Sequence, residues 1–502
     1  MYSMSGDADQ PPEPVLKNAA RGYRSTLATQ VVRVGCKVIS IVVMARLVAP
    51  TGYGNFAMAA SVFWLLALFR DAGLGTAAIQ AKKLNASQMT NLFWAQLIIG
   101  VVVAGLMWGM APWAARWYRT DAIIPLVQVM SLAFVIIGLG GFMRTQLLRE
   151  MRIARANRLE AIAAVVATFF MIVAGLLNAG AFSFVVFLIV SESVASGLAW
   201  RETTWRPSGR PNGRGLGQLW RVGYHITVHQ SLTFLLSQLD SIAIGRWFGA
   251  HMIGLYNRTG QLLTLPTQYV AGPFGQVMLA TLSRLKPNSP EFKQHAWNTV
   301  GHVSCLILPI YAVCIVLPEP TIQLLLGSDW LEAAALLRAL AIGGAATAVT
   351  SLAQSVNVAL GRTDRLIGAA LIALPFLVAA IAWGAPHGVQ GIANGIAGAH
   401  VLIALPRLWW LLRDFPGAFR SYCACLFLPV GIMIGFMVGL ALGQSLVGNA
   451  AVWWVQLVAA LPTATTLLIL ATLASPTLRR QFTKTWNFVT GRQSLSPDQP
   501  SS

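Results

Sequence analysis

The chain has 502 residues, of which 56% are hydrophobic and only 11% charged, and its formal net charge is +19. The charge alone would suit a nucleic-acid-binding protein, but so apolar a composition argues against one. Apolar segments long enough to span a membrane, at about 20 residues each, follow one another with only short gaps. This pattern indicates a polytopic membrane protein without room for a soluble catalytic domain.

We predict about fourteen spanning helices and therefore an all-α fold. In chain order the segments are 25–48, 55–79, 89–111, 122–143, 159–178, 181–200, 219–245, 255–282, 296–317, 331–356, 366–384, 388–406, 421–442 and 452–473.

Basic residues mark every second gap between these segments. Of the 36 Lys and Arg, 27 lie in alternate gaps or in the two tails. The other set of gaps holds only Arg46, Arg116, Arg119 and Arg246. Because basic residues accumulate on the cytoplasmic side, both termini are predicted to be cytoplasmic. Two five-arginine clusters, in the gaps around 144–158 and 201–221, fit either this orienting role with anionic lipid contact or docking of an acidic partner.

The five cysteines predict neither a disulfide framework nor a metal site. All lie inside apolar segments, where cysteine acts as a small hydrophobic residue, and none has metal-ligand spacing: Cys36, Cys305, Cys314, Cys423 and Cys425. No cofactor is expected.

A weak internal repeat appears at an offset of 200 residues. ARLVAPTGYGNFAMAA from Ala45 aligns with GRWFGAHMIGLYNRTG from Gly245, so that Arg46 and Gly54 match Arg246 and Gly254. An offset of six helices predicts a parallel repeat. The expected division is a cytoplasmic tail, a six-helix lobe, a basic linker, a second six-helix lobe, two additional helices and a cytoplasmic tail: 1–24, 25–200, 201–218, 219–406, 407–473 and 474–502.

The first spanning segment carries a polar stripe. Its members are three or four residues apart and so share one helical face: Thr26, Gln30, Arg33, Lys37 and Ser40. A cation at the bilayer centre costs roughly 2.5–3.5 kcal/mol on insertion scales, and the segment has no acidic residue to offset Arg33 and Lys37. Two readings stay open. The cations either bind an anionic ligand or form structural ion pairs with Asp71, Glu192 or Asp240.

Segment 219–245 carries the matching stripe of the second lobe. It contains His225, His229, Thr233, Ser237 and Ser241, with Asp240 beside them. Both stripes are expected to line one central cavity. The histidines could line it, handle protons or, at i and i+4, hold a metal, but no third ligand is near. Arg70 is a further intramembrane cation, next to Asp71.

Four segments of the chain resemble bacterial polysaccharide flippases. They are RLVAPTGYGNFAMA from Arg46, FRDAGLGTAAIQ from Phe69, LDSIAIGRWFGAHMIGLYNRTGQLLTLPTQYVAGPFGQVMLATLSRL from Leu239, and ALGRTDRL from Ala359. The family is that of the Wzx-like lipopolysaccharide and exopolysaccharide exporters of the colanic-acid type. It belongs to the multidrug/oligosaccharidyl-lipid/polysaccharide flippase superfamily. The resemblance covers about residues 20–480.

The resemblance implies a transporter, not an enzyme, in the bacterial inner membrane. Its cargo would be an undecaprenyl-pyrophosphate-linked oligosaccharide for exopolysaccharide, capsule or lipopolysaccharide synthesis. Arg33, Lys37, Arg70 and Gln30 would contact the anionic cargo, Arg most specifically because of its bidentate fork. His229, Asp240, Thr233 and Ser237 would line the cavity or couple transport. Membrane lipids, and the polymerase and glycosyltransferases of the pathway, are the expected partners; nucleic acid is not.

Two other functions remain as alternatives. A cation-coupled multidrug antiporter would need buried carboxylates in the first lobe, where this chain has cations. An integral-membrane polymerase would need a large outer loop or paired carboxylates, whereas the outer gaps hold only Asp121, Glu319 and Asp329.

Overall fold

The computed structural model describes residues 13–70, 75, 78–79, 84–208, 216–282, 285–286, 289–360, 362–415, 417–447 and 452–474. Side chains are described over the same ranges except for 13–28, 216–237, 277, 280, 359, 363–364, 367 and 467–474.

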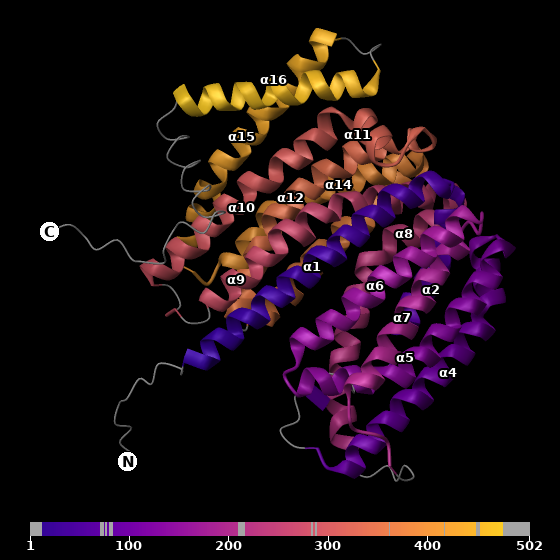
Figure 1. Ribbon diagram of the computed structural model, residues 1–502. Coiled ribbons are helices and arrows are strands. Elements are labelled where there is room, and N and C mark those ends of the chain that lie inside the picture. Colours follow the sequence, from indigo (N-terminus) through magenta and orange to yellow (C-terminus); the bar gives the residue numbers. More distant parts are fainter. Residues whose placement is uncertain are drawn as a thin grey trace, which may run out of the picture. The chain divides into compact units, whose positions relative to one another are not determined.

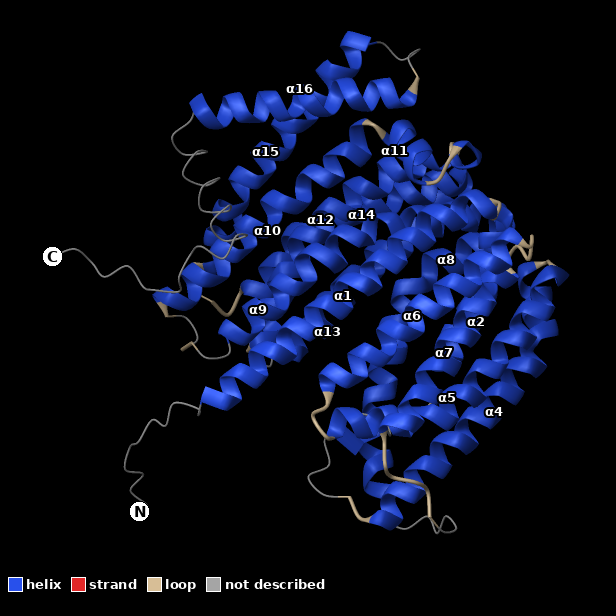
Figure 2. Cartoon of the chain, viewed as in Figure 1, coloured by secondary structure: helices blue, strands red, loops and turns tan. Residues whose placement is uncertain are grey.

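All regular structure in these ranges is helical, which confirms the all-α membrane fold (Figure 2). Within the described ranges, eight helices are long and apolar enough to cross a membrane. One of them, Gly368–Leu412, contains two successive helices. The number of about fourteen crossings therefore stays a prediction.

The chain divides into two compact units, Met1–His251 and Met252–Ser502. Figure 1 labels most of the helices and colours the chain in sequence order, from indigo to yellow. The first unit holds α1 (Glu13–Leu47), α2 (Pro50–Ala67), α4 (Ala86–Tyr118), η1 (Asp121–Ile123), α5 (Ile124–Arg149), α6 (Ile153–Leu176), α7 (Phe182–Glu202) and most of α8 (Leu216–Pro266). The second holds the end of α8, then η2 (Thr267–Ala271), α9 (Gly272–Leu282), α10 (Pro290–Val316), α11 (Pro318–Leu325), η3 (Ser328–Trp330), α12 (Ala333–Ala359), α13 (Thr363–Gly384), η4 (Ala385–His387), α14 (Gly388–Leu412), α15 (Ala418–Val447) and α16 (Trp453–Ala474). The predicted domain boundaries remain an expectation.

The turn predicted between segments 219–245 and 255–282 is a break at one residue. Gly249, inside α8, has φ 81° and ψ −174°, outside the helical region and accessible at low cost only to glycine. Next to the break, Gly54 of α2 lies against the Ala250 backbone so closely that a Cβ would overlap the carbonyl. Gly54 is therefore required for α2 to approach α8.

Small residues allow the helices of the first unit to pack closely. α1 packs on α6, α6 on α7, α7 on α5 and α5 on α4. Between α4 and α5, a Cβ on Gly100 would lie 2.6 Å from the Phe134 carbonyl oxygen. Such close contact is typical of helices in membranes, where apolar burial does not drive association.

The second unit contains elements that hydropathy did not predict. α10, α12 and α14 pack in succession, α13 covers α14, and α15 lies between α10 and α16. The expected segment 255–282 is interrupted after Pro266 by a π-helical turn, Thr267–Ala271. The short α11 and η3 precede α12, and the side chain of Trp330 in η3 is fully buried.

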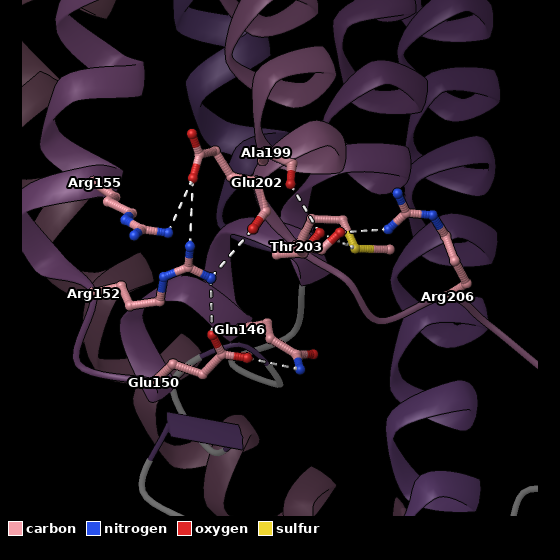
Figure 3. A network of polar contacts seen from close by, with 9 residues as sticks. Gln146, Glu150, Arg152, Arg155, Ala199, Glu202, Thr203 and Arg206 are labelled. Carbon is pink, nitrogen blue, oxygen red and sulfur yellow. Dashed lines mark hydrogen bonds and ion pairs between the residues drawn. The ribbon is translucent and has the colours of Figure 1, made fainter.

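Arginines at one end of the first unit bind the exposed ends of its helices (Figure 3). The Glu202 carboxylate accepts from Arg152 and Arg155, each at 3.4 Å. Arg206 donates to the carbonyls of Thr203 and Trp200 at 2.6 and 2.9 Å. Since the last carbonyls of a helix have no partner within it, part of both arginine clusters has a structural role, whatever their predicted role in orientation.

Candidate functional site

The predicted cationic stripe lies on α1, and Arg33 forms an ion pair across to α6. Its Nη1 lies 2.8 Å from Oε2 of Glu160. α1 and α6 are packed together within the first unit, so the two side chains are brought together by that packing. Lys37 follows one turn after Arg33 on the same face and is half-buried.

Protein atoms cover only a little more than half of each side chain of this ion pair. The Arg33 and Glu160 side chains are 43% and 46% exposed. Ion pairs so weakly covered contribute roughly 0.2–1 kcal/mol to stability in water. Glu160 lies seven residues after the start of α6, which places it roughly 10 Å along the helix from that end. Both side chains are therefore accessible to a ligand, and Glu160 is the second residue of the predicted spanning segment 159–178.

Of the acidic partners predicted for Arg33, Glu192 is wrong. Glu160 pairs with Arg33, whereas Glu192, one of the predicted partners, pairs with Arg144 of α5 at 2.7 Å. Asp71 lies outside the described residues. The sequence carried a signal for Glu160 that the prediction missed. Glu160 is the single acidic residue in the predicted segment 159–178, and an intramembrane carboxylate indicates a function or a cationic partner.

The other predicted site residues are placed as follows. Gln30 is exposed on α1, three residues before Arg33. Arg70 is half-buried in the turn that follows α2, where its backbone N–H donates to the Ala67 carbonyl. Asp240, on α8, is half-buried and accepts a 2.7 Å hydrogen bond from the Ser241 backbone N–H. Three predicted residues lie on α8, in the range whose side chains are not described: His229, Thr233 and Ser237.

The second unit contains a cavity of about 290 Å³ beside the π-helical turn. Thr267, Gln276, Ser351 and Ser355 supply its polar groups, and none of its described lining residues is charged. The Thr267 hydroxyl lies 3.0 Å from that of Tyr311, which in turn donates to the Leu263 carbonyl. Sequence analysis missed this cavity because it follows from a π-helical turn between two apolar helices.

Residues 43–335 match the family model described as "Polysaccharide biosynthesis protein". The teichuronic acid biosynthesis protein TuaB of Bacillus subtilis is 23% identical over 59% of this chain and 61% of its own length. The lipopolysaccharide biosynthesis protein WzxC of Escherichia coli is 20% identical over 85% of this chain and 88% of its own. The succinoglycan biosynthesis transport protein ExoT of Rhizobium meliloti is 24% identical over 70% of this chain and 72% of its own length.

Solved membrane transporters share the fold. The lipid II flippase MurJ in an inward closed conformation superposes with a TM-score of 0.69 at 14% identity, covering 89% of this chain and 98% of MurJ. An inward-facing multidrug resistance MATE family transporter superposes with a TM-score of 0.61 at 15% identity, covering 77% of this chain and 96% of the transporter. Neither likeness extends beyond the fold.

Proposed function

Because this chain belongs to the polysaccharide biosynthesis protein family of Wzx-like flippases, we propose that it flips an undecaprenyl-diphosphate-linked oligosaccharide across the bacterial inner membrane. Family and fold indicate a transporter, not an enzyme. The cargo would serve exopolysaccharide, capsule or lipopolysaccharide synthesis, and the enzymes of that pathway would be its partners. WzxC and ExoT, named for lipopolysaccharide biosynthesis and succinoglycan transport, support this substrate class.

The accessible cation on α1 carries the proposal. A lipid-linked oligosaccharide has a diphosphate at the boundary between lipid and glycan. The Arg33 guanidinium, 43% exposed and held by one carboxylate, can present its planar fork to two phosphate oxygens. Lys37 adds a second positive charge one turn away, and Gln30 adds an amide on the same helix.

The test is export by variants of the two cations. Arg33→Ala and Lys37→Ala are expected to abolish export in a strain lacking its own flippase while protein remains in the membrane. Arg116→Ala, which removes an exposed arginine in the last turn of α4, serves as the control and should export normally. Normal export by both neutral variants would overturn the anion site.

The orientation of the chain is a separate part of the proposal. Both termini and the 201–218 linker are assigned to the cytoplasm from the Lys and Arg distribution, with lobes 25–200 and 219–406 and two additional helices in 407–473. An impermeant thiol reagent added from outside should modify a cysteine at position 387 and leave one at position 212 unmodified. The reverse pattern would contradict the orientation.

Asp240 is assigned to coupling, together with His229, Thr233 and Ser237. All four lie on α8, which carries the second polar stripe. Asp240→Asn is expected to slow turnover more than it weakens cargo binding, as measured in vesicles under imposed pH gradients. Wild-type rates with unchanged gradient dependence would leave Asp240 a structural residue.

A further inference from the structure

The ion pair between Arg33 and Glu160 is accessible from outside the protein. Arg33 and Glu160 lie 2.8 Å apart, yet nearly half of each side chain is uncovered by protein. Another ion pair of the same unit, Arg144–Glu192, has nearly the same length, 2.7 Å, but side-chain exposures of 25% and 20%. A ligand can therefore reach Arg33 and displace its carboxylate more easily than it can reach Arg144.

α1 and α6 also pack together at a distance from this pair. Gly175, near the far end of α6, lies close to Met44 and Leu47 of α1; a Cβ there would be 3.1 Å and 3.0 Å from their terminal side-chain carbons. Met44 is fully buried. Apolar contacts of this kind hold the two helices together, so the ion pair can open without separating them.

We propose that Glu160 is a resident counter-ion, which occupies Arg33 in the empty transporter and is displaced by the diphosphate of the cargo. This inference rests on the function proposed above. A diphosphate offers more negative charge than a carboxylate and several oxygens in the geometry that a guanidinium binds bidentately, so it competes effectively for Arg33.

Such an exchange would assist release of the cargo. A guanidinium without a resident carboxylate offers all its N–H donors to an incoming anion, so an empty site with Arg33 alone would hold its anion tightly. With Glu160 seven residues into α6 and within reach, departure of the cargo is matched by return of the carboxylate. Glu160 would then set the affinity low enough for turnover.

The test is binding of farnesyl diphosphate to the purified full-length protein in phosphatidylcholine nanodiscs, with farnesol as the probe lacking phosphate. Glu160→Gln removes the competing charge and keeps the shape. We expect it to bind farnesyl diphosphate about three- to five-fold more tightly, with a slower dissociation rate and an unchanged response to farnesol. Glu192→Gln, the matched control, should leave the affinity unchanged.

The outcomes separate this inference from the proposed function. If Arg33→Ala binds the probe as wild type does, the anion site itself fails. If Arg33→Ala weakens binding but Glu160→Gln binds as wild type or more weakly, only the counter-ion role fails. If Glu160→Gln does not fold, Glu160→Asp gives the same test: its shorter side chain competes less well, and faster dissociation than in wild type would overturn the proposal.

Discussion

Two of the ion pairs in the first unit, Arg33–Glu160 and Arg144–Glu192, have the same chemistry and different surroundings. Their lengths are 2.8 and 2.7 Å, but the first pair is about twice as exposed as the second. Losing one partner of a covered pair leaves a polar group that water cannot reach, whereas an exposed group is resolvated. If Arg33–Glu160 exchanges as proposed, the comparison teaches that exposure, more than length, separates an exchangeable contact from a structural one.

Reversing the charge at the exposed pair should have the largest effect. Arg33→Glu places two carboxylates beside one another and repels an anionic cargo, so export should fall to the level of a strain without the protein. The double variant Arg33→Glu/Glu160→Arg restores an ion pair. We expect it to recover abundance and thermal stability without matching wild-type export. Export at the wild-type level by Arg33→Glu, measured as extracellular polysaccharide, would contradict the assignment.

Neutralising the covered pair should mainly affect stability. Glu192→Gln removes the charged acceptor of Arg144, and we expect a loss of about 1–3 kcal/mol in the free energy of unfolding. Glu160→Gln should cost less than about 1 kcal/mol, because its pair is exposed. Thermal unfolding of both purified variants measures the comparison. Equal losses would remove the distinction between the two pairs.

The network at the helix ends offers an intermediate case. Glu202 is 39% exposed and is shared by Arg152 and Arg155 at 3.4 Å, longer than either ion pair above. Glu202→Gln is therefore expected to lower the free energy of unfolding by about 0.5 kcal/mol or less. Thermal unfolding checks this value, and a loss as large as that of Glu192→Gln would show that the network is cooperative.

The uncharged cavity of the second unit should give the smallest effect on anion binding. No described residue lining it is charged. Ser355→Ala is therefore expected to change the affinity for farnesyl diphosphate by less than about two-fold, which is the size of a neutral contact at most. Binding in nanodiscs tests this expectation, and a loss comparable to that of Arg33→Ala would place the anion site elsewhere.

Hydropathy and residue order determined the all-α membrane fold and the family, both of which are confirmed. A membrane-spanning helix must contain a long apolar run, so its presence can be predicted from local sequence alone. The same reasoning predicts Arg33 and Lys37 as site residues, because cations are costly in such a run. It also indicated that the chain turns near Gly249, although not that the turn is one residue.

Only the tertiary structure decided which groups meet. Arg33 and Glu160 are 127 residues apart in sequence, and their pairing follows from the packing of α1 on α6. Likewise, the sequence allowed Glu192 to pair with Arg33, but the packing of α5 on α7 brings Glu192 to Arg144. Periodicity assigns a residue to one face of a helix, but the neighbour of that face depends on close contacts between small residues over the whole unit.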